Sequence, residues 1–235
     1  PRGVKFIERR ANLADGKPYV WFAFVIDQDA NKRLKFNAVE VEGGTTPSKL
    51  YAAWSEYGQG RPVVVANAGF FNMRTLESVS LLMDEGRVEA ADVRSVSRTN
   101  ANGQKVDVFP IHAAFGQMPD GSYEAQWIFC QPEKGYHPYV YPFAVGNDDS
   151  LRLYSPVPPA VGQLGSYPWQ VVDAVAAGPM LVKNGRDVSL ESSLGESYYR
   201  TIGGKARHNR TAIGLTDDGK RVIMVVDGRG MNGSV

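Results

Sequence analysis

The chain has 235 residues, with 26 basic side chains against 25 acidic ones, so its formal net charge is only +1. Proteins that hold nucleic acid through phosphate contacts rely on a basic surface, and this balance argues against a nucleic-acid partner. Hydrophobic residues make up 43% of the chain, which is typical of a folded domain with a substantial core and excludes a disordered protein.

The apolar segments are too short to cross a membrane as helices. The longest of them, Tyr19–Ile26, has the length of a strand, whereas a spanning helix needs about 18 apolar residues or more. We therefore expect no transmembrane segment. The chain begins at Pro1 with neither a Met nor an apolar leader, and we expect that its natural start was processed, trimmed or left out.

The N-terminal region predicts strands followed by one helix. Tyr19–Ile26 is apolar on both faces, which is typical of a central strand covered on each side, and the more mixed segment 34–41 could pair beside it. Thr46 is a suitable N-cap and Pro47 a suitable first helical residue. Apolar residues then follow at helical spacing, and Gly58 ends the predicted helix.

The rest of the chain predicts short strands and tight turns. Val63–Ala66 is a short β-branched run, Val222–Val226 is apolar on both faces and predicts an internal strand, and Lys134–Trp169 predicts a long loop with short strands. Glycine turns between β-prone runs predict three hairpins, at residues 84–86, 183–186 and 217–220.

Together these elements indicate a single α+β domain. We expect its core to be a mixed, largely antiparallel sheet with few flanking helices. Residues 1–62 supply the N-terminal strands and helix of this domain, and residues 63–235 supply the remainder.

Several common types of catalytic site are missing from the sequence. It contains no G-x-S-x-G, G-x-x-x-x-G-K-[ST] or H-E-x-x-H motif, and its three histidines are widely spaced. We expect His112 and His137 to be satisfied polar residues in or near the core, with no cofactor and no metal ligated by histidines. Cys130 is the only cysteine, so no internal disulfide can form, and we expect it to be buried at the end of strand-like residues 123–130.

Polar or small residues follow apolar runs at two places in the middle of the chain. The first, Asn67–Asn72, contains Gly69 and Phe70, and its small residues would let the backbone approach a ligand. A tight turn with two core aromatics also explains it, and the residues alone favour this structural explanation. The second, Ala176–Val182, contains Gly178 before a hairpin, and this glycine is explained by either a structural or a functional role.

A third and richer group lies near the C-terminus. If residues 210–229 form a hairpin, its ends meet, and Arg210 and Thr211 lie near Asp227 and Arg229. Two guanidinium groups beside one carboxylate can form a structural ion-pair cluster. They can equally form a receptor for a phosphate or carboxylate ligand, and the residues alone leave both alternatives open.

These three segments, in this order, resemble the motifs of the phosphodiester glycosidase domain family. The family's Asn-x-Gly-Phe-Phe resembles residues 67–71, and its Gly-Pro-x-Leu-Val with a following glycine turn resembles residues 178–185. Its Arg-Thr-Ala-Ile-Gly, Asp-Gly turn and Val-Asp-Gly-Arg resemble residues 210–214, 218–219 and 226–229. The similarity extends from about Val63 to Gly233.

The resemblance implies hydrolysis of a sugar-1-phosphodiester, with a sugar-phosphate or glycan as the partner molecule. It implies that Asp227 and Arg210 are catalytic. The residues that it implies for substrate binding are Asn67, Gly69, Phe70, Gly178, Thr211 and Arg229. It also implies an exported protein, periplasmic or anchored at the cell surface of a bacterium.

One alternative and one expectation complete the sequence analysis. The alternative is a non-catalytic carbohydrate-binding or cell-envelope module on the same fold, with aromatic residues of 136–169 stacking on sugar rings.

The expectation concerns the C-terminus, since family members continue with a helix and an Asp-Gly-Gly-Gly-Ser segment. The predicted strand Val222–Val226 needs cover on both faces, so we expect the native protein to extend several tens of residues beyond Val235.

Overall fold

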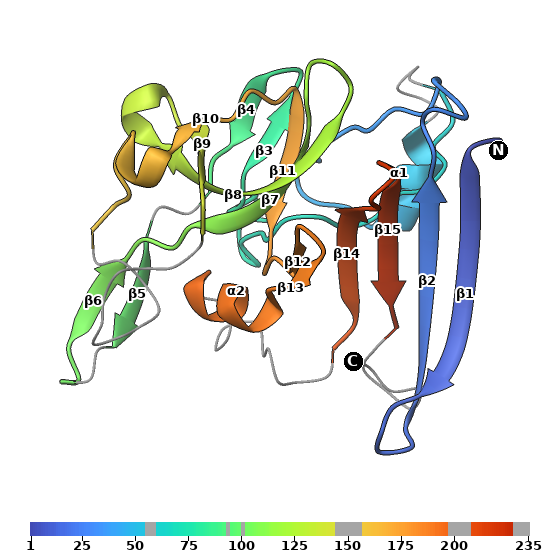
Figure 1. Cartoon of the computed structure of the whole chain (residues 1–235), viewed down its shortest axis with the longest axis horizontal. Coiled ribbons are helices and arrows are strands. Elements are labelled where there is room, and N and C mark those ends of the chain that lie inside the picture. The colour runs from blue at the N-terminus through green and yellow to red at the C-terminus, as the bar shows by residue number, and fades with distance from the viewer. Residues whose placement is uncertain (55–59, 93–94, 100–101, 144–156, 197–207, 228–235) are drawn as a thin grey trace. The chain divides into compact units, whose positions relative to one another are not determined.

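The computed structural model describes residues 1–54, 60–92, 95–99, 102–143, 157–196 and 208–227. The chain divides into two compact units (Figure 1). The first unit comprises residues 1–36, 41–68 and 206–235, and the second comprises residues 37–40 and 69–205. We describe each unit by itself.

The first unit is built on a four-stranded antiparallel sheet whose order is β1-β2-β15-β14. Its strands are β1 (Val4–Asn12), β2 (Pro18–Ile26), β14 (Arg210–Leu215) and β15 (Arg221–Val226). Both strands predicted to be internal, β2 and β15, have hydrogen-bonded neighbours on each side. The prediction is confirmed for each, and the C-terminal strand thereby joins the N-terminal one.

Two segments of the first unit form no strand, contrary to the sequence analysis. The segment 34–41 does not pair with β2, because both edges of β2 are occupied by β1 and β15. Leu34 is instead buried, and its carbonyl oxygen accepts a hydrogen bond from Arg221. Val63–Ala66 also lies outside any strand. Its β-branched residues supply strand propensity, but a strand also needs a partner edge.

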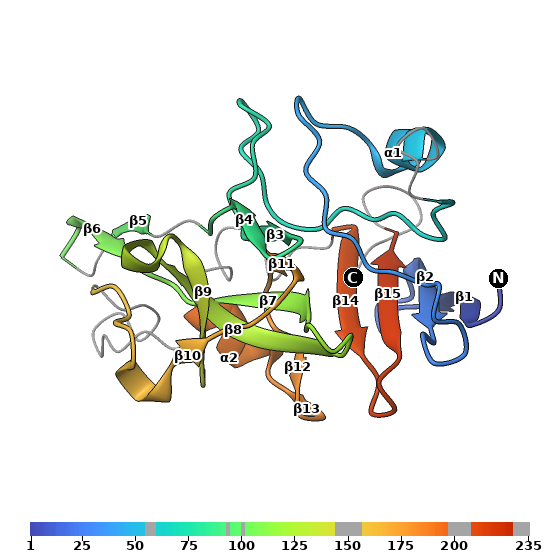
Figure 2. The same ribbon diagram turned by 90° about the horizontal axis from the view of Figure 1, so that it is seen from above.

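The predicted helix is present as α1 (Pro47–Ala53), which lies to one side of the four-stranded sheet (Figure 2). Thr46 caps it as predicted, because its side-chain oxygen accepts a hydrogen bond from the Lys49 N–H. Pro47 occupies the first turn, where a missing N–H costs nothing. The predicted end at Gly58 lies outside the described residues.

The second unit is built on a seven-stranded antiparallel sheet whose order is β10-β9-β8-β7-β11-β3-β4. Two small hairpins, β5–β6 and β12–β13, and the helix α2 (Ser189–Gly195) accompany it. The strands of the unit are β3 (Leu82–Asp84), β4 (Arg87–Ala90), β5 (Val96–Thr99), β6 (Lys105–Val108), β7 (His112–Gln117), β8 (Tyr123–Gln131), β9 (His137–Tyr141), β10 (Tyr167–Pro168), β11 (Asp173–Ala177), β12 (Val182–Lys183) and β13 (Arg186–Asp187). Short 3₁₀ turns, η2 (Pro132–Lys134) and η3 (Gln163–Gly165), lie in the predicted loop region.

The three predicted hairpin turns are confirmed. They connect β3 to β4, β12 to β13 and β14 to β15. In each turn a glycine has a positive φ, between 72° and 80°, which residues with a side chain rarely adopt. The fold class is α+β, as predicted, and every pairing among the described strands is antiparallel.

Strand β8 separates the core of the second unit into two apolar clusters. Ile128 and Cys130 point into one cluster, which also holds the fully buried Trp169. The alternate residues Trp127 and Phe129 point into the other. A strand that is buried on both faces in this way fixes the positions of the elements on either side of it.

The sequence also predicts that Cys130 is buried and that His112 and His137 are satisfied residues in or near the core. Cys130 is 1% exposed, as expected, and its burial raises the pKa of the thiol to about 12. His112 is a satisfied core residue, because its Nδ1 lies 2.8 Å from Asp92. The same prediction for His137 is wrong, since its buried Nε2 has no hydrogen-bond partner among the described residues. No helix of the described part of the chain is long and apolar enough to cross a membrane.

Candidate functional site

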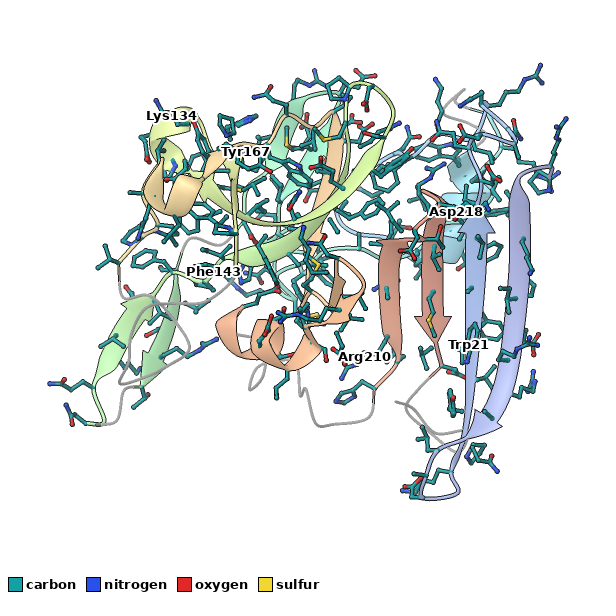
Figure 3. All side chains as sticks on the ribbon, viewed as in Figure 1. Trp21, Lys134, Phe143, Tyr167, Arg210 and Asp218 are labelled. Carbon is teal, nitrogen blue, oxygen red and sulfur yellow. The ribbon has the colours of Figure 1, made fainter. Side chains whose placement is uncertain are left out.

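The first unit brings four of the predicted site residues to one end of its sheet. Arg210 is the first residue of β14 and lies opposite Val226, the last residue of β15. Asp227 follows directly, and its N–H donates to the Val20 carbonyl oxygen at 2.9 Å. Figure 3 shows Arg210 and Asp218 at opposite ends of this hairpin. The prediction that the two ends of this hairpin meet, so that Arg210 lies near Asp227 in space, is therefore confirmed at the level of the main chain.

A side-chain hydrogen bond joins Thr211 to Asn67 across 144 residues of sequence. The Thr211 hydroxyl donates to the Asn67 Oδ1 at 2.8 Å. With its oxygen engaged in this way, the exposed Asn67 can offer its NH₂ group to a ligand. The bond also holds the segment that ends at Ala68 against β14.

Strand alternation sorts these side chains by face. Directly opposed residues of an antiparallel pair point to the same face, so Arg210 shares a face with Val226, and Thr211 shares the other face with Val225. Asp227, which is exposed, follows the last residue of β15. The end of the sheet thus offers a cation, a carboxylate and a hydroxyl–amide pair. Arg229 lies outside the described residues.

The second unit brings together the three other predicted site residues. Gly69 lies so close to β11 that a Cβ atom would stand 2.8 Å from the Ala176 carbonyl oxygen and 2.8 Å from the Ser80 Cβ. The Phe70 N–H donates to the Ser80 Oγ at 2.9 Å. Because Ala176 lies two residues before Gly178, the Gly69–Phe70 and Gly178 segments are neighbours.

The loop that follows Phe70 is ordered by its own hydrogen bonds. Asn72 Oδ1 accepts from the N–H groups of Arg74 and Thr75, at 2.9 and 3.3 Å. The loop exposes 51% of Phe71. The alternative in which both aromatics of this motif are core residues is therefore wrong for Phe71, whereas Phe70 is half-buried.

The sequence analysis missed one ionisable residue of the second unit, Glu196. Its side chain is 0% exposed, and three N–H groups donate to it. Oε1 accepts from the Met180 N–H at 2.8 Å and from the Trp127 indole at 2.9 Å, and Oε2 accepts from the Ala113 N–H at 2.8 Å. Two of these donors are backbone groups, which carry no sequence signal.

Burial governs the titration of this region. Burial raises the pKa of Glu196 to about 7, against the opposing effect of its N–H donors. Burial alone lowers the pKa of His112, but the adjacent Asp92 carboxylate and then Glu196 outweigh it and raise this pKa above its usual value. Both groups therefore hold a proton more tightly in the folded protein than in the unfolded chain.

The described residues contain no group of three or more His, Cys, Asp or Glu side chains that could hold a metal ion. What the two units offer a ligand is hydrogen-bonding and charged groups on the first unit, and closely packed backbone at Gly69 and Gly178 on the second. The groups of the first unit can by themselves bind a sugar or a phosphate and supply a carboxylate for catalysis.

Comparison with known proteins identifies relatives of this chain. Residues 60–234 match the family described as phosphodiester glycosidase. No match was found among curated proteins. Two solved structures share the fold. A hypothetical protein from Synechocystis is 15% identical with a TM-score of 0.55, and the comparison covers 99% of this chain and 52% of that one.

The second solved structure is the catalytic domain of zebrafish N-acetylglucosamine-1-phosphodiester α-N-acetylglucosaminidase, auto-inhibited by its pro-peptide. It is 14% identical with a TM-score of 0.52, and the comparison covers 100% of this chain and 64% of that one. The chain therefore spans less than two thirds of the length of either structure.

The close approach at Gly69 predicts that its substitution is costly. Gly69→Ala should lower the free energy of unfolding by about 1–3 kcal/mol, because the methyl group has to displace backbone at Ala176. Gly214→Ala is the matched control, since a Cβ at that position meets nothing within 4 Å. Urea denaturation followed by circular dichroism measures both. Equal stability of the two variants would contradict the close packing.

The raised pKa values predict a pH dependence of stability. A group whose folded-state pKa lies above its unfolded value stabilises the fold at low pH, and this contribution is lost as pH rises through the folded pKa. For Glu196, with a pKa of about 7 against 4.5, the loss between pH 5 and pH 8 is about 3 kcal/mol. His112 acts in the same direction.

Thermal melts between pH 5 and pH 8 test this expectation. The melting temperature should fall as pH rises, and Glu196→Gln should make its dependence on pH shallower. A pH dependence of the melting temperature that is the same in Glu196→Gln as in the wild-type protein would contradict the raised pKa of Glu196.

Proposed function

Because the chain belongs to the phosphodiester glycosidase family, we propose that it hydrolyses the glycosidic bond of a sugar-1-phosphodiester. Water replaces the phosphate at the anomeric carbon, so the products are a free sugar and a phosphomonoester. The observation that carries the proposal is that Arg210, Asp227 and the hydrogen-bonded pair Thr211–Asn67 all lie at one end of the first unit's sheet.

Arg210 binds the phosphodiester in this proposal. Its guanidinium can donate two parallel hydrogen bonds to phosphate oxygens, and it neutralises the charge that grows on the leaving phosphate as the glycosidic bond breaks. The long side chain allows it to reach past the end of β14. Arg229 would be a second cation for the same anion.

Asp227 acts at the anomeric carbon. Its exposed carboxylate either attacks this carbon as a nucleophile or removes a proton from the attacking water. Ordinary glycosidases pair such a carboxylate with a general acid that protonates a poor alcohol leaving group. A phosphate leaves far more readily, so a single carboxylate assisted by an arginine is sufficient.

The remaining residues bind and orient the substrate. Asn67, held by Thr211, donates its NH₂ group to a sugar hydroxyl or to the phosphate. Gly69 and Gly178 let the main chain approach the substrate closely, and Phe70 supplies an apolar face beside them.

We also propose that the protein acts outside the cytoplasm, in the periplasm or at the cell surface of a bacterium. The proposal rests on the usual setting of the family. The single buried cysteine is compatible with it, because the described fold depends on no disulfide.

Substitution of the two charged residues tests the reaction. With a methyl diester of N-acetylglucosamine 1-phosphate as substrate, Arg210→Ala should lower kcat/KM by about 10²–10³-fold, because it removes a charge-stabilising donor. Asp227→Ala should lower it by about 10²–10⁴-fold, because it removes the base or nucleophile. Release of the free sugar is measured.

The control variants are Arg10→Ala and Asp218→Ala, which remove exposed charges of the same two types elsewhere in the first unit. Arg10 pairs with Glu8 on β1, and Asp218 lies at the other end of the β14–β15 hairpin. Both controls should retain wild-type activity. Full activity of Arg210→Ala and Asp227→Ala would refute the residue roles. Binding of glycans without turnover, unaffected by Asp227→Ala, would favour the non-catalytic module.

Fractionation of cells that express the full-length gene product tests the location. The protein should be recovered from the periplasmic or surface fraction, together with a marker of that compartment. Recovery with a cytoplasmic marker enzyme would contradict export while leaving the proposed reaction untouched.

A further inference from the structure

The carboxylate of Glu196 is the meeting point of four separate parts of the second unit. It receives the N–H of Ala113 on β7, the indole of Trp127 on β8 and the N–H of Met180, which lies just before β12. Glu196 itself follows the last residue of α2, and its own N–H donates to the Ser192 carbonyl oxygen at 2.7 Å. None of these groups belongs to the charged set of the first unit.

All three groups that hydrogen-bond to the Glu196 side chain can only donate. Backbone and indole N–H groups cannot accept a hydrogen bond, so the group that satisfies them in a buried site must present two acceptor oxygens. A carboxylate does so. Glutamine of the same length would turn an NH₂ group toward at least one of the donors, which leaves a buried N–H without a partner.

The bond to Met180 has a consequence beyond stability. Met180 lies two residues after Gly178, so an anchor at its N–H fixes the path of the main chain at Gly178. The hairpin that follows Met180 is joined at its base, because the Val188 N–H donates to the Leu181 carbonyl oxygen at 2.9 Å before α2 begins. Because Glu196 is the last residue of the segment 178–196, its bond to the Met180 N–H ties the end of this segment to its start.

The position of the Gly69–Phe70 segment depends on the position of Gly178. Gly69 packs against Ala176, the residue that precedes Gly178 by two, with no room for a single additional carbon atom. A shift of Gly178 would be passed to Gly69 and Phe70, because this contact cannot yield without moving backbone.

We propose that Glu196 is a positioning residue, whose buried carboxylate holds the Met180 main chain and thereby the Gly178 and Gly69 segments in the geometry that binds the substrate. The assignment rests on the proposed function, in which these two glycine segments contact the sugar phosphodiester. Glu196 acts through Met180 and does not touch the substrate.

The test compares Glu196→Gln with a matched loss of a buried polar group elsewhere in the unit. Gln131 is 2% exposed and donates to the Tyr141 hydroxyl at 2.7 Å and to the Pro159 carbonyl oxygen at 2.6 Å. Gln131→Met therefore removes buried hydrogen bonds that do not reach Met180. Both variants should have lower melting temperatures than the wild-type protein, so stability alone does not separate them.

Kinetics and hydrogen exchange separate them. With the methyl diester of N-acetylglucosamine 1-phosphate, Glu196→Gln should raise KM by about 10-fold with kcat changed less than about 3-fold, which is the pattern of lost substrate binding. Hydrogen exchange of the Met180 amide should speed up by at least about 10-fold relative to other core amides. Gln131→Met should change neither KM nor the Met180 exchange.

Two further variants keep the test decisive. Trp127→Phe removes one donor but leaves the Met180 bond, so its KM and Met180 exchange should match those of the wild-type protein. Glu196→Asp keeps the charge but shortens the side chain, and it takes the place of Glu196→Gln if that variant does not fold. It should raise KM and speed up Met180 exchange in the same direction, by a smaller factor.

The outcomes also distinguish this inference from the proposed function. If the wild-type protein hydrolyses no diester, the proposed function fails, and the exchange of the Met180 amide still decides whether Glu196 anchors the segment. If the diester is hydrolysed and Glu196→Gln has the same KM as Gln131→Met, Glu196 has only a structural role and the inference is overturned. Unchanged Met180 exchange in Glu196→Gln would overturn it as well.

Discussion

The first unit depends on the insertion of β15 between β2 and β14. This strand comes from the last part of the described chain, yet it completes a sheet whose other half is formed by the first 26 residues. The pairing fixes the register that places Arg210 opposite Val226 and puts Asp227 beside them. The local β14–β15 hairpin thus brings Arg210 to the level of Asp227, whereas the long-range pairing of β15 with β2 and the bond from the Asp227 N–H to the Val20 carbonyl oxygen hold this end of the hairpin in the sheet.

Elements with a strong local cause could be predicted from the sequence. The β14–β15 turn follows from a glycine with a positive φ between β-branched runs, and α1 follows from a capping Thr46 with Pro47 behind it. The errors concern partners. Segment 34–41 has acceptable strand residues, but the edge that it would need belongs to β15. No feature of these residues reveals that a strand almost two hundred positions away occupies the place.

The residues of the candidate site also divide into those that the sequence could reveal and those that it could not. Gly178 directly follows β11 and Arg210 begins β14, and a rigid element can aim the residues at its end. Asn67 and Gly69 follow the apolar run 63–66, which marked them as candidates although it forms no strand. Glu196 could not be found by such reasoning. Two of its three partners are main-chain N–H groups, whose presence at every residue gives no signal, and the distance to Ala113 along the chain is 83 residues. Only the fold shows that this carboxylate is enclosed by donors.

A buried carboxylate is a costly way to hold three N–H groups. Its ionised form loses its hydration, which is why burial raises the pKa of Glu196, and cores often become more stable when buried charged groups are replaced by apolar ones. An apolar residue of similar size would fill the space but would leave the N–H groups of Met180 and Ala113 buried without acceptors. The carboxylate therefore resolves a constraint that the path of the chain creates, in which β7 and the segment after Gly178 both turn donors toward one point. Glu196 fixes the main-chain path at Gly178, but its ionisation lowers the stability of the fold above pH 7. Such a loss of stability is expected where a backbone segment serves binding and not only packing.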